Sequence, residues 1–185
     1  MKKKVSRKEL EEMIKNGEDV TNVDTSGITD MSWLFYNATS FNQDISNWDV
    51  SSVEDMSNMF YNATKFNQDI GNWDTSNVMI MVSMFTRASS FNQDLSSWDV
   101  SNVVNMRCMF DLATSFNQDI STWDVSNVKD PRAMFYSTSS FNQVNMYKWF
   151  NKNKNVDLSI FMGTKLENNK KFKKFIELHA AINEL

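Results

Sequence analysis

The feature that most constrains this chain is a repeat of 25 residues that recurs with no insertion or deletion. Its most regular part, Phe-Asn-Gln-Asp-Ile/Leu, starts at Phe41, Phe66, Phe91 and Phe116, and a degraded copy starts at Phe141. Each copy continues into Trp-Asp-Val/Thr-Ser, which starts at Trp48, Trp73, Trp98 and Trp123. A fixed period predicts structural units that stack side by side and bury equivalent side chains in continuous columns.

The first half of each repeat has the pattern of a short helix. Asp30 is suited to cap its N-terminus, and Asn37 is suited to its exit. The apolar residues of this half lie at i, i+3, i+4 and i+7, namely Met31, Leu34, Phe35 and Ala38. This spacing predicts an amphipathic helix that turns one face to the core.

The second half, from Asp44 to Val50, is flanked by Ser, Asn and Thr and has the composition of a strand between turns. One strand and one short helix per repeat predict an α/β repeat fold. We expect a leucine-rich-repeat-like, right-handed solenoid of about five coils, whose strands stack about 4.8 Å apart.

The two ends of the chain differ from the repeat and are suited to cover the open ends of the stack. Residues 5–16 predict a helix, in which Ser6 and Glu9 form a capping box. Residues 167–183 predict a final amphipathic helix. We therefore expect an N-terminal capping helix over 1–19, the repeats over 20–147 and a C-terminal cap over 148–185.

The composition suits one domain of 185 residues and sets limits on its location. Cys108 is the one cysteine, so no internal disulfide can form. No apolar run after Met1 matches a signal peptide, and none approaches the roughly 18 residues of a membrane span. We expect a monomer that is cytoplasmic as the sequence stands, or surface-exposed or secreted if a signal segment has been removed.

Charge is unevenly distributed along the chain. Residues 17–147 carry five basic and sixteen acidic side chains, whereas both ends are basic. An acidic array repels a phosphate backbone, so we expect no direct binding of nucleic acid by the repeats. The lysines of the last helix either form a solvated face or bind an acidic partner, and they are Lys170, Lys171, Lys173 and Lys174.

Two columns of aspartates are the most distinctive polar feature. They are Asp44, Asp69, Asp94 and Asp119, and Asp49, Asp74, Asp99 and Asp124. Like charges about 5 Å apart repel by roughly 1 kcal/mol per pair in a water-like dielectric, so something must offset the repulsion. The simpler interpretation is that each carboxylate accepts hydrogen bonds from turn amides and from nearby Ser or Asn. The alternative is calcium held between coils.

The remaining candidates have simple structural interpretations. The column of Asn42 and its equivalents predicts a hydrogen-bonded ladder that satisfies turn backbone. The Trp column predicts core packing, with a sugar-stacking platform as the alternative. His179 lies on an apolar helix stripe, and Cys108 reads as a free thiol at an outward helix position. We find no catalytic constellation and expect no enzyme activity, no cofactor and no metal.

The repeat resembles a known family. The residues on which the resemblance rests are Asn47 to Val53, Met56, Met59-Phe60, Ala63 and Phe66 to Ile70. They resemble the 25-residue repeat of mycoplasma-type lipoproteins and other bacterial surface proteins, which is grouped with BspA-like leucine-rich repeats. The resemblance covers about residues 20–147. It implies strands on a concave face, helices on a convex face, and a role in surface adhesion or protein interaction.

A regular scaffold without an active site predicts a protein-interaction module, because exposed positions that vary on a rigid scaffold are where binding specificity lies. The protein partner is not identified by the sequence. The predicted contact residues lie on the strand face, and they are Asp44, Ser46, Asp69, Asp94, Ser96 and Asp119. The alternative is an intracellular inhibitor that blocks a nucleic-acid-processing enzyme through the acidic columns.

Overall fold

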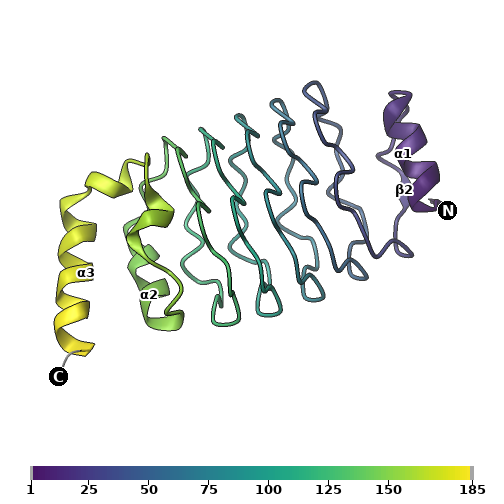
Figure 1. The fold of residues 1–185 in the computed structure, drawn as a ribbon. Helices are drawn as coiled ribbons and strands as arrows, with labels where there is room; N and C mark the ends of the chain where they lie inside the picture. The colour runs from purple at the N-terminus through teal and green to yellow at the C-terminus, as the bar shows by residue number, and fades with distance from the viewer. Residues whose placement is uncertain (1, 184–185) are drawn as a thin grey trace.

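The computed structural model describes residues 2–183, and their side chains as far as residue 178. The elements are β1 (Lys3–Lys4), α1 (Arg7–Lys15), β2 (Val23–Asp24), η1 (Val144–Lys148), α2 (Trp149–Lys152), η2 (Leu158–Phe161), η3 (Leu166–Asn168) and α3 (Lys170–Asn183). Between β2 and η1 the chain winds into coils that lie side by side, with α1 at one end and α3 at the other (Figure 1). Within residues 2–183, no helix has the length and apolarity needed to cross a membrane.

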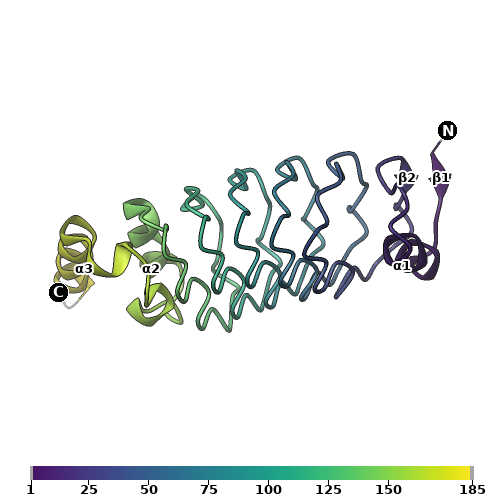
Figure 2. The ribbon, with the colours of Figure 1, turned by 90° about the horizontal axis from the view of Figure 1, so that it is seen from above.

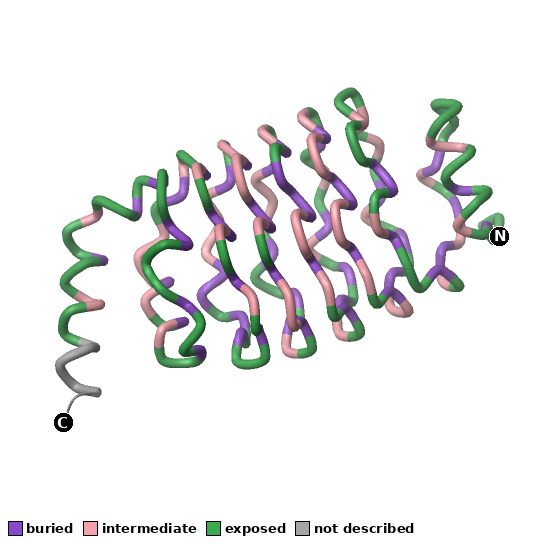
Figure 3. The backbone as a smooth tube through the Cα atoms, viewed as in Figure 1, coloured by how far each residue is buried: buried purple, intermediate pink, exposed green. Residues whose placement is uncertain are grey.

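Equivalent side chains of successive coils form continuous aromatic columns, as the repeat predicts. The Phe35 column runs to Phe161 with ring centroids 5.3–5.6 Å apart. The Phe41 column also ends on Phe161, with spacings of 5.8–6.2 Å. From Trp73 onward the tryptophan rings lie 6.2–6.4 Å apart. Buried stretches accordingly recur at the same place in successive coils (Figure 3). The core therefore runs the length of the array.

The prediction of a short helix between Asp30 and Ala38 is wrong, because alternate amides of this segment donate outside their own coil. The amides of Met31, Trp33, Phe35 and Asn37 donate to the carbonyls of Asp55, Ser57, Met59 and Tyr61 in the next coil, at 2.8–2.9 Å. The intervening amides of Leu34, Tyr36 and Ala38 close tight turns onto Met31, Trp33 and Phe35, at 3.0–3.4 Å. The segment is thus a ribbon of turns that joins coils, and we call it the ladder ribbon.

Two residues in each ladder ribbon adopt the left-handed backbone conformation, and this is why a helix cannot form. In the first coil they are Trp33 and Asn37, with φ of 64° and 58°. The equivalents in later coils are Asn58, Asn62, Ser83, Arg87, Cys108, Leu112, Ala133 and Ser137. The amides of Trp33 and Asn37 themselves donate to the next coil, whereas the amides that follow them, those of Leu34 and Ala38, donate back within the coil. Asn tolerates this conformation better than most residues, which explains its place in the first two coils.

The prediction of a strand over Asp44–Val50 is also wrong, because this half consists of two consecutive turns. Asp44 Oδ1 accepts the amide of Ser46 at 3.0 Å, and Asp49 Oδ1 accepts the amide of Ser51 at 3.1 Å. The buried residues of this half do not alternate as they would in a strand, and they are Ile45, Trp48 and Val50. Residues 44–50 therefore present turns, not a strand face.

Inter-coil pairing is parallel but consists of isolated bridges, and within the described chain no continuous sheet runs through the coils. The bridges link Asp30 to Asp55, Asp55 to Ile80, Ile80 to Asn105 and Asn105 to Asp130. The one sheet assigned there is the pair β1 and β2, at the N-terminal end in Figure 2. The turns between paired residues interrupt the extended backbone that a sheet requires.

The N-terminal cap contains the expected helix. α1 begins after Ser6, whose side chain accepts the amide of Glu9, and the Glu9 carboxylate accepts the amide of Ser6 in return. Arg7 reaches from α1 to the first coil and donates to the main-chain carbonyls of Asp30 and Ser32. In later coils the equivalent carbonyls accept amides of the preceding coil. Arg7 therefore replaces part of a missing coil.

The C-terminal cap continues the ladder instead of leaving it open. The amides of Phe135 and Ser137 donate to Ile160 and Met162 at 3.1 and 2.8 Å. Phe161 stacks on the last rings of both Phe columns, and Phe172 of α3 closes it edge-on at 5.3 Å. The C-terminal end of the core is therefore covered.

Candidate interaction surface

The two aspartate columns line one edge of the array, which we call the acidic edge. Each carboxylate accepts the backbone amide two residues further on, so it forms part of a turn. In the first column the distances from Asp44, Asp69, Asp94 and Asp119 are 2.9–3.0 Å. In the second column those from Asp49, Asp74, Asp99 and Asp124 are 2.9–3.1 Å. Amide and hydroxyl donors thus offset the like charges, which confirms the simpler interpretation of these columns.

Hydrogen bonds favour the ionised form of several carboxylates of the acidic edge. The hydroxyl of Ser46 and then its amide lower the pKa of Asp44, and Ser76 lowers the pKa of Asp74 in the same way. The pKa of Asp119 is also lowered: burial raises it, but the hydrogen bonds from Asn145 and Ser121 outweigh that effect. Asp44, Asp74 and Asp119 therefore carry negative charge at neutral pH.

Each carboxylate of the first column uses Oδ1 for its turn, so the availability of Oδ2 decides whether it can bind a partner. The side chains of Asp44, Asp69 and Asp94 are exposed, and no donor among the described residues reaches their Oδ2 atoms. Asp119 differs, because Asn145 of the C-terminal cap donates to its Oδ2 at 2.8 Å. Asp119 is therefore a structural contact between the last coils and the cap.

The two serines predicted as contact residues differ in the same way. Ser46 is partly buried, and its hydroxyl donates to Asp44 Oδ1 at 2.6 Å. Ser96 is exposed, and its amide donates to Asp94 at 2.9 Å, while its carbonyl accepts the hydroxyl of Thr122. Among the six predicted residues, Asp44, Asp69, Asp94 and Ser96 therefore keep the most exposed surface.

The asparagine column forms the predicted ladder. The amides of Asn67, Asn92, Asn117 and Asn142 each donate to the side-chain oxygen of the Asn one coil earlier, at 2.8–2.9 Å. The neighbouring glutamines donate to the main-chain carbonyl of the same earlier Asn. Asn169 ends this asparagine column by donating its side-chain amide to Asn142 at 2.9 Å. These amides are structural and serve the stacking of coils.

The tryptophan column is buried, which confirms the core interpretation over a sugar-binding platform. Trp48, Trp73, Trp98 and Trp123 each donate Nε1–H to a main-chain carbonyl 28 residues earlier, at 2.8–3.2 Å. Trp149 continues the column one position late, but its buried Nε1 has no partner among the described residues. The C-terminal cap therefore keeps the ring and loses the hydrogen bond.

A second exposed surface lies on the ladder ribbons of the first two coils, and the sequence analysis missed it. Trp33 and Tyr36 are exposed, with ring centroids 4.8 Å apart, and Tyr36 stacks on Tyr61 at 4.9 Å. The sequence analysis expected a helix here and chose its contact residues in the second half of the repeat. Tyr36 and Tyr61 occupy the same position of consecutive repeats, which is the signal that could have revealed this surface.

Further along the same column stands Asp111, one of whose carboxylate oxygens is buried and has no hydrogen-bond partner among the described residues. Burial raises its pKa, and the nearby Arg87 opposes that shift. Cys108 occupies a left-handed position of the ladder ribbon, not the outward face of a helix. Burial is the main cause that raises the pKa of the Cys108 thiol, which disfavours a reactive thiolate.

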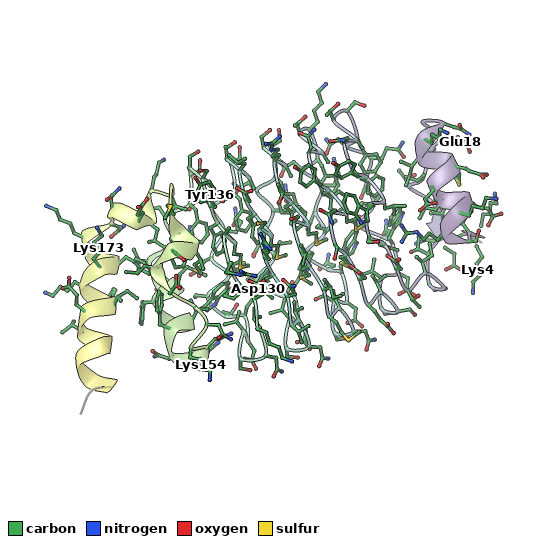
Figure 4. All side chains as sticks on the ribbon, in the orientation of Figure 1. Lys4, Glu18, Asp130, Tyr136, Lys154 and Lys173 are labelled. Atoms are coloured by element: carbon green, nitrogen blue, oxygen red, sulfur yellow. The ribbon has the colours of Figure 1, made fainter. Side chains whose placement is uncertain are left out.

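The remaining candidates are a metal site, His179 and the basic side chains. Within the described residues, no three His, Cys, Asp or Glu side chains come together in a way that could hold a metal ion. The side chain of His179 lies outside the described residues. Basic side chains gather at the C-terminal end, where Figure 4 labels Lys154 and Lys173.

Comparison with known protein families places the repeats in a family. A family model described as Mycoplasma protein of unknown function, DUF285, matches two overlapping regions, residues 4–106 and 70–177. The overlap is what a repeat family produces when the model spans several coils. Neither the curated proteins nor the solved structures contain a match to this chain.

Proposed function

The chain belongs to the DUF285 family of Mycoplasma proteins of unknown function, and from its geometry we propose that it is a non-enzymatic protein-recognition module. One observation carries the proposal. Asp44, Asp69 and Asp94 are held in identical turns, and each presents an Oδ2 atom for which the described chain supplies no donor. A cationic segment of a partner protein finds there a pre-organised row of acceptors.

Rigidity supports this function. The turns fix each carboxylate through its own backbone, and the aromatic columns fix the coils relative to one another. A partner therefore meets charges that need no ordering on binding, which lowers the entropic cost of association. Charge-assisted hydrogen bonds from Arg or Lys would match free carboxylate oxygens of this kind.

The experiment compares two variants that keep the turns. Asn at Asp44, Asp69 and Asp94 retains the Oδ1 acceptor and removes the charge, as Asn105 does naturally with the amide of Arg107 at 3.0 Å. The wild-type protein, immobilised and exposed to extract of its own organism, should retain a partner that the D44N/D69N/D94N variant loses. D119N is the matched control and should retain it. Equal recovery by all three proteins would contradict the acidic edge as the site.

A second candidate function uses the same edge. The net charge of −11 over residues 17–147 favours an inhibitor that occupies the cationic groove of a nucleic-acid-processing enzyme. Competition discriminates between the two: DNA or RNA should displace the chain from such an enzyme and should leave any other partner bound.

We also propose that the array is a right-handed relative of BspA-like leucine-rich repeats. The 25-residue period and the stacked Phe and Trp columns support this grouping. Such a relationship would include a strongly altered ladder segment, since no continuous sheet runs through the coils in residues 2–183. An experimental structure that showed the opposite winding would contradict the grouping.

A further inference from the structure

The N-terminal end of the array is only partly covered. A hollow of about 520 Å³ lies between α1 and the first coil, with Ile14 and Glu18 on one side and Ala38, Ser40 and Phe41 on the other. Phe41 is partly exposed, whereas its equivalents in all later coils are fully buried. Figure 4 labels Glu18 at the end of α1 that borders this space. The N-terminal end of the Phe41 column is therefore partly accessible.

The backbone beside the hollow is open as well. The carbonyls of Leu34 and Tyr36 receive no donor from the described chain, although the equivalents in each later coil accept amides of the preceding coil. The amide of Asn42 likewise has no acceptor among residues 2–183, whereas each later Asn of its column donates to an Asn side chain. Two carbonyls and one amide of the first coil are therefore unpaired within the described chain.

The residues 25 positions earlier cannot supply these contacts. They begin at Leu10 and belong to α1 and the turn that follows it, where the helical amides are used within the helix. Arg7 satisfies only Asp30 and Ser32, at one end of the ladder ribbon. The opposite end of the array differs, because η2 closes both the ladder and the Phe columns there.

The repeat itself defines what fits. In the array, the carbonyl equivalent to that of Leu34 accepts the amide of a Phe in the preceding coil. The carbonyl equivalent to that of Tyr36 accepts the amide two residues after that Phe. Four residues further on is a second Phe, whose ring stacks on the Phe of the next coil, as Phe41 stacks on Phe66. The Asn after it accepts an amide of the next coil, as Asn42 accepts the amide of Asn67. The complementary segment thus reads Phe-x-Asn-Ala-x-x-Phe-Asn.

We propose that this hollow and its open edge bind such a half-coil, presented by another polypeptide as an uncapped end of the same kind of repeat. The second Phe side chain of the segment enters the hollow beside Phe41, and the volume of the hollow lies in the range of about 300–1,000 Å³ typical of ligand sites. The backbone adds to the ladder in the manner of strand addition. A folded second copy is not the source, because its half-coils are internal and η2 covers its far end. The aspartates of the acidic edge are not among the residues that line the hollow.

The probe is a synthetic peptide with the sequence of residues 60–67, acetylated, amidated and labelled with a fluorophore. Titrated with the full chain and followed by anisotropy, it should bind saturably with one peptide per chain. Replacing its second Phe with Ala should weaken binding about tenfold or more, since burying one Phe contributes roughly 1.5–3 kcal/mol. N-methylation at its first and third residues should also weaken binding, because both ladder donors are lost.

Protein variants locate the site without disturbing the core. Ser40 is exposed and lines the hollow, so S40W should block the peptide. D44N/D69N/D94N should bind it as the wild type does, which separates this inference from the proposed function. No saturable binding, equal binding of the N-methylated peptide, or undiminished binding to S40W would each overturn the proposal. Loss of binding in D44N/D69N/D94N would also overturn it, since the lysine of the peptide would then be bound by the acidic edge.

Discussion

The guanidinium of Arg7 holds Asp30 in two ways, because it donates to the main-chain carbonyl and pairs with the carboxylate at 2.7 Å. A second nitrogen of the same side chain donates to Ser32. One planar side chain therefore occupies two of the four main-chain carbonyls that a preceding coil would occupy. The end of an open array is a liability unless its backbone acceptors are satisfied or blocked.

Replacing Arg7 with Met should loosen the first ladder ribbon and lower the free energy of unfolding by about 1–2 kcal/mol, since charged hydrogen bonds and a partly exposed ion pair are lost. Arg7→Lys should fall between the wild type and Met, because it keeps the charge without the planar fork. Hydrogen exchange of residues 31–37 and urea unfolding measure both effects. Unchanged exchange in Arg7→Met would contradict the capping role.

The left-handed positions predict a stabilising substitution. Leu112 has a φ of 57°, which costs most non-Gly residues about 1–2 kcal/mol and costs Asn less. Leu112→Asn should therefore raise the free energy of unfolding by up to about 1 kcal/mol. Ser115→Asn is the control, because Ser115 is exposed and is not among the left-handed residues. Thermal unfolding followed by circular dichroism compares the two, and equal shifts would rule out the backbone explanation.

The Trp column offers a matched pair of substitutions. Trp98 donates Nε1–H to the carbonyl of Ile70 at 2.9 Å, whereas the buried Nε1 of Trp149 has no partner in the described chain. Both changes to Phe remove similar volume, but only Trp98→Phe removes a hydrogen bond. It should therefore cost about 1 kcal/mol more than Trp149→Phe. Urea unfolding of the two variants gives the difference, and a larger loss for Trp149→Phe would be inconsistent with this structure.

The acidic edge predicts a pH dependence with a definite sign. The pKa values of Asp44, Asp74 and Asp124 are lowered on folding by their serine neighbours, from an unfolded value of about 3.9. The unfolded chain thus binds more protons near pH 4, so this contribution to stability is fully present above about pH 5. It is lost as pH falls through the lowered folded values. Urea unfolding at several pH values tests this, and D44N/D74N/D124N should show a shallower loss.

How far the sequence could be interpreted depends on which contacts are local. The capping box of Ser6 and Glu9 is formed within three residues, and it was predicted correctly from those residues. The stacking of Phe35 on Phe60 follows from the period, because identical residues in register need no detailed backbone. The turn role of the aspartates is equally local, since Asp44 accepts an amide two residues away.

The sequence interpretation placed the pairing between coils in the second half-repeat, whereas the structure places it in the first. Met31, Leu34 and Phe35 are buried, as a helix would have them, and a ribbon of turns buries the same set. Periodicity alone cannot separate the two arrangements, because both place i, i+3 and i+4 inward. Asn58 and Asn62 were the local signal for left-handed backbone and hence for turns, but Asn is also common at helix ends.

The sequence by itself determined the period, the aromatic columns, the aspartate turns and the helices at both ends. Only the tertiary structure decided that the ladder runs through residues 31–37 and that Asp119 belongs to the cap. It also showed that the hollow beside Phe41 is open. The physical reason is that an amide of the ladder ribbon can donate within its own turn or to a carbonyl 24 residues later. The acceptor in the neighbouring coil decides between these two partners, and it is present only in the folded array.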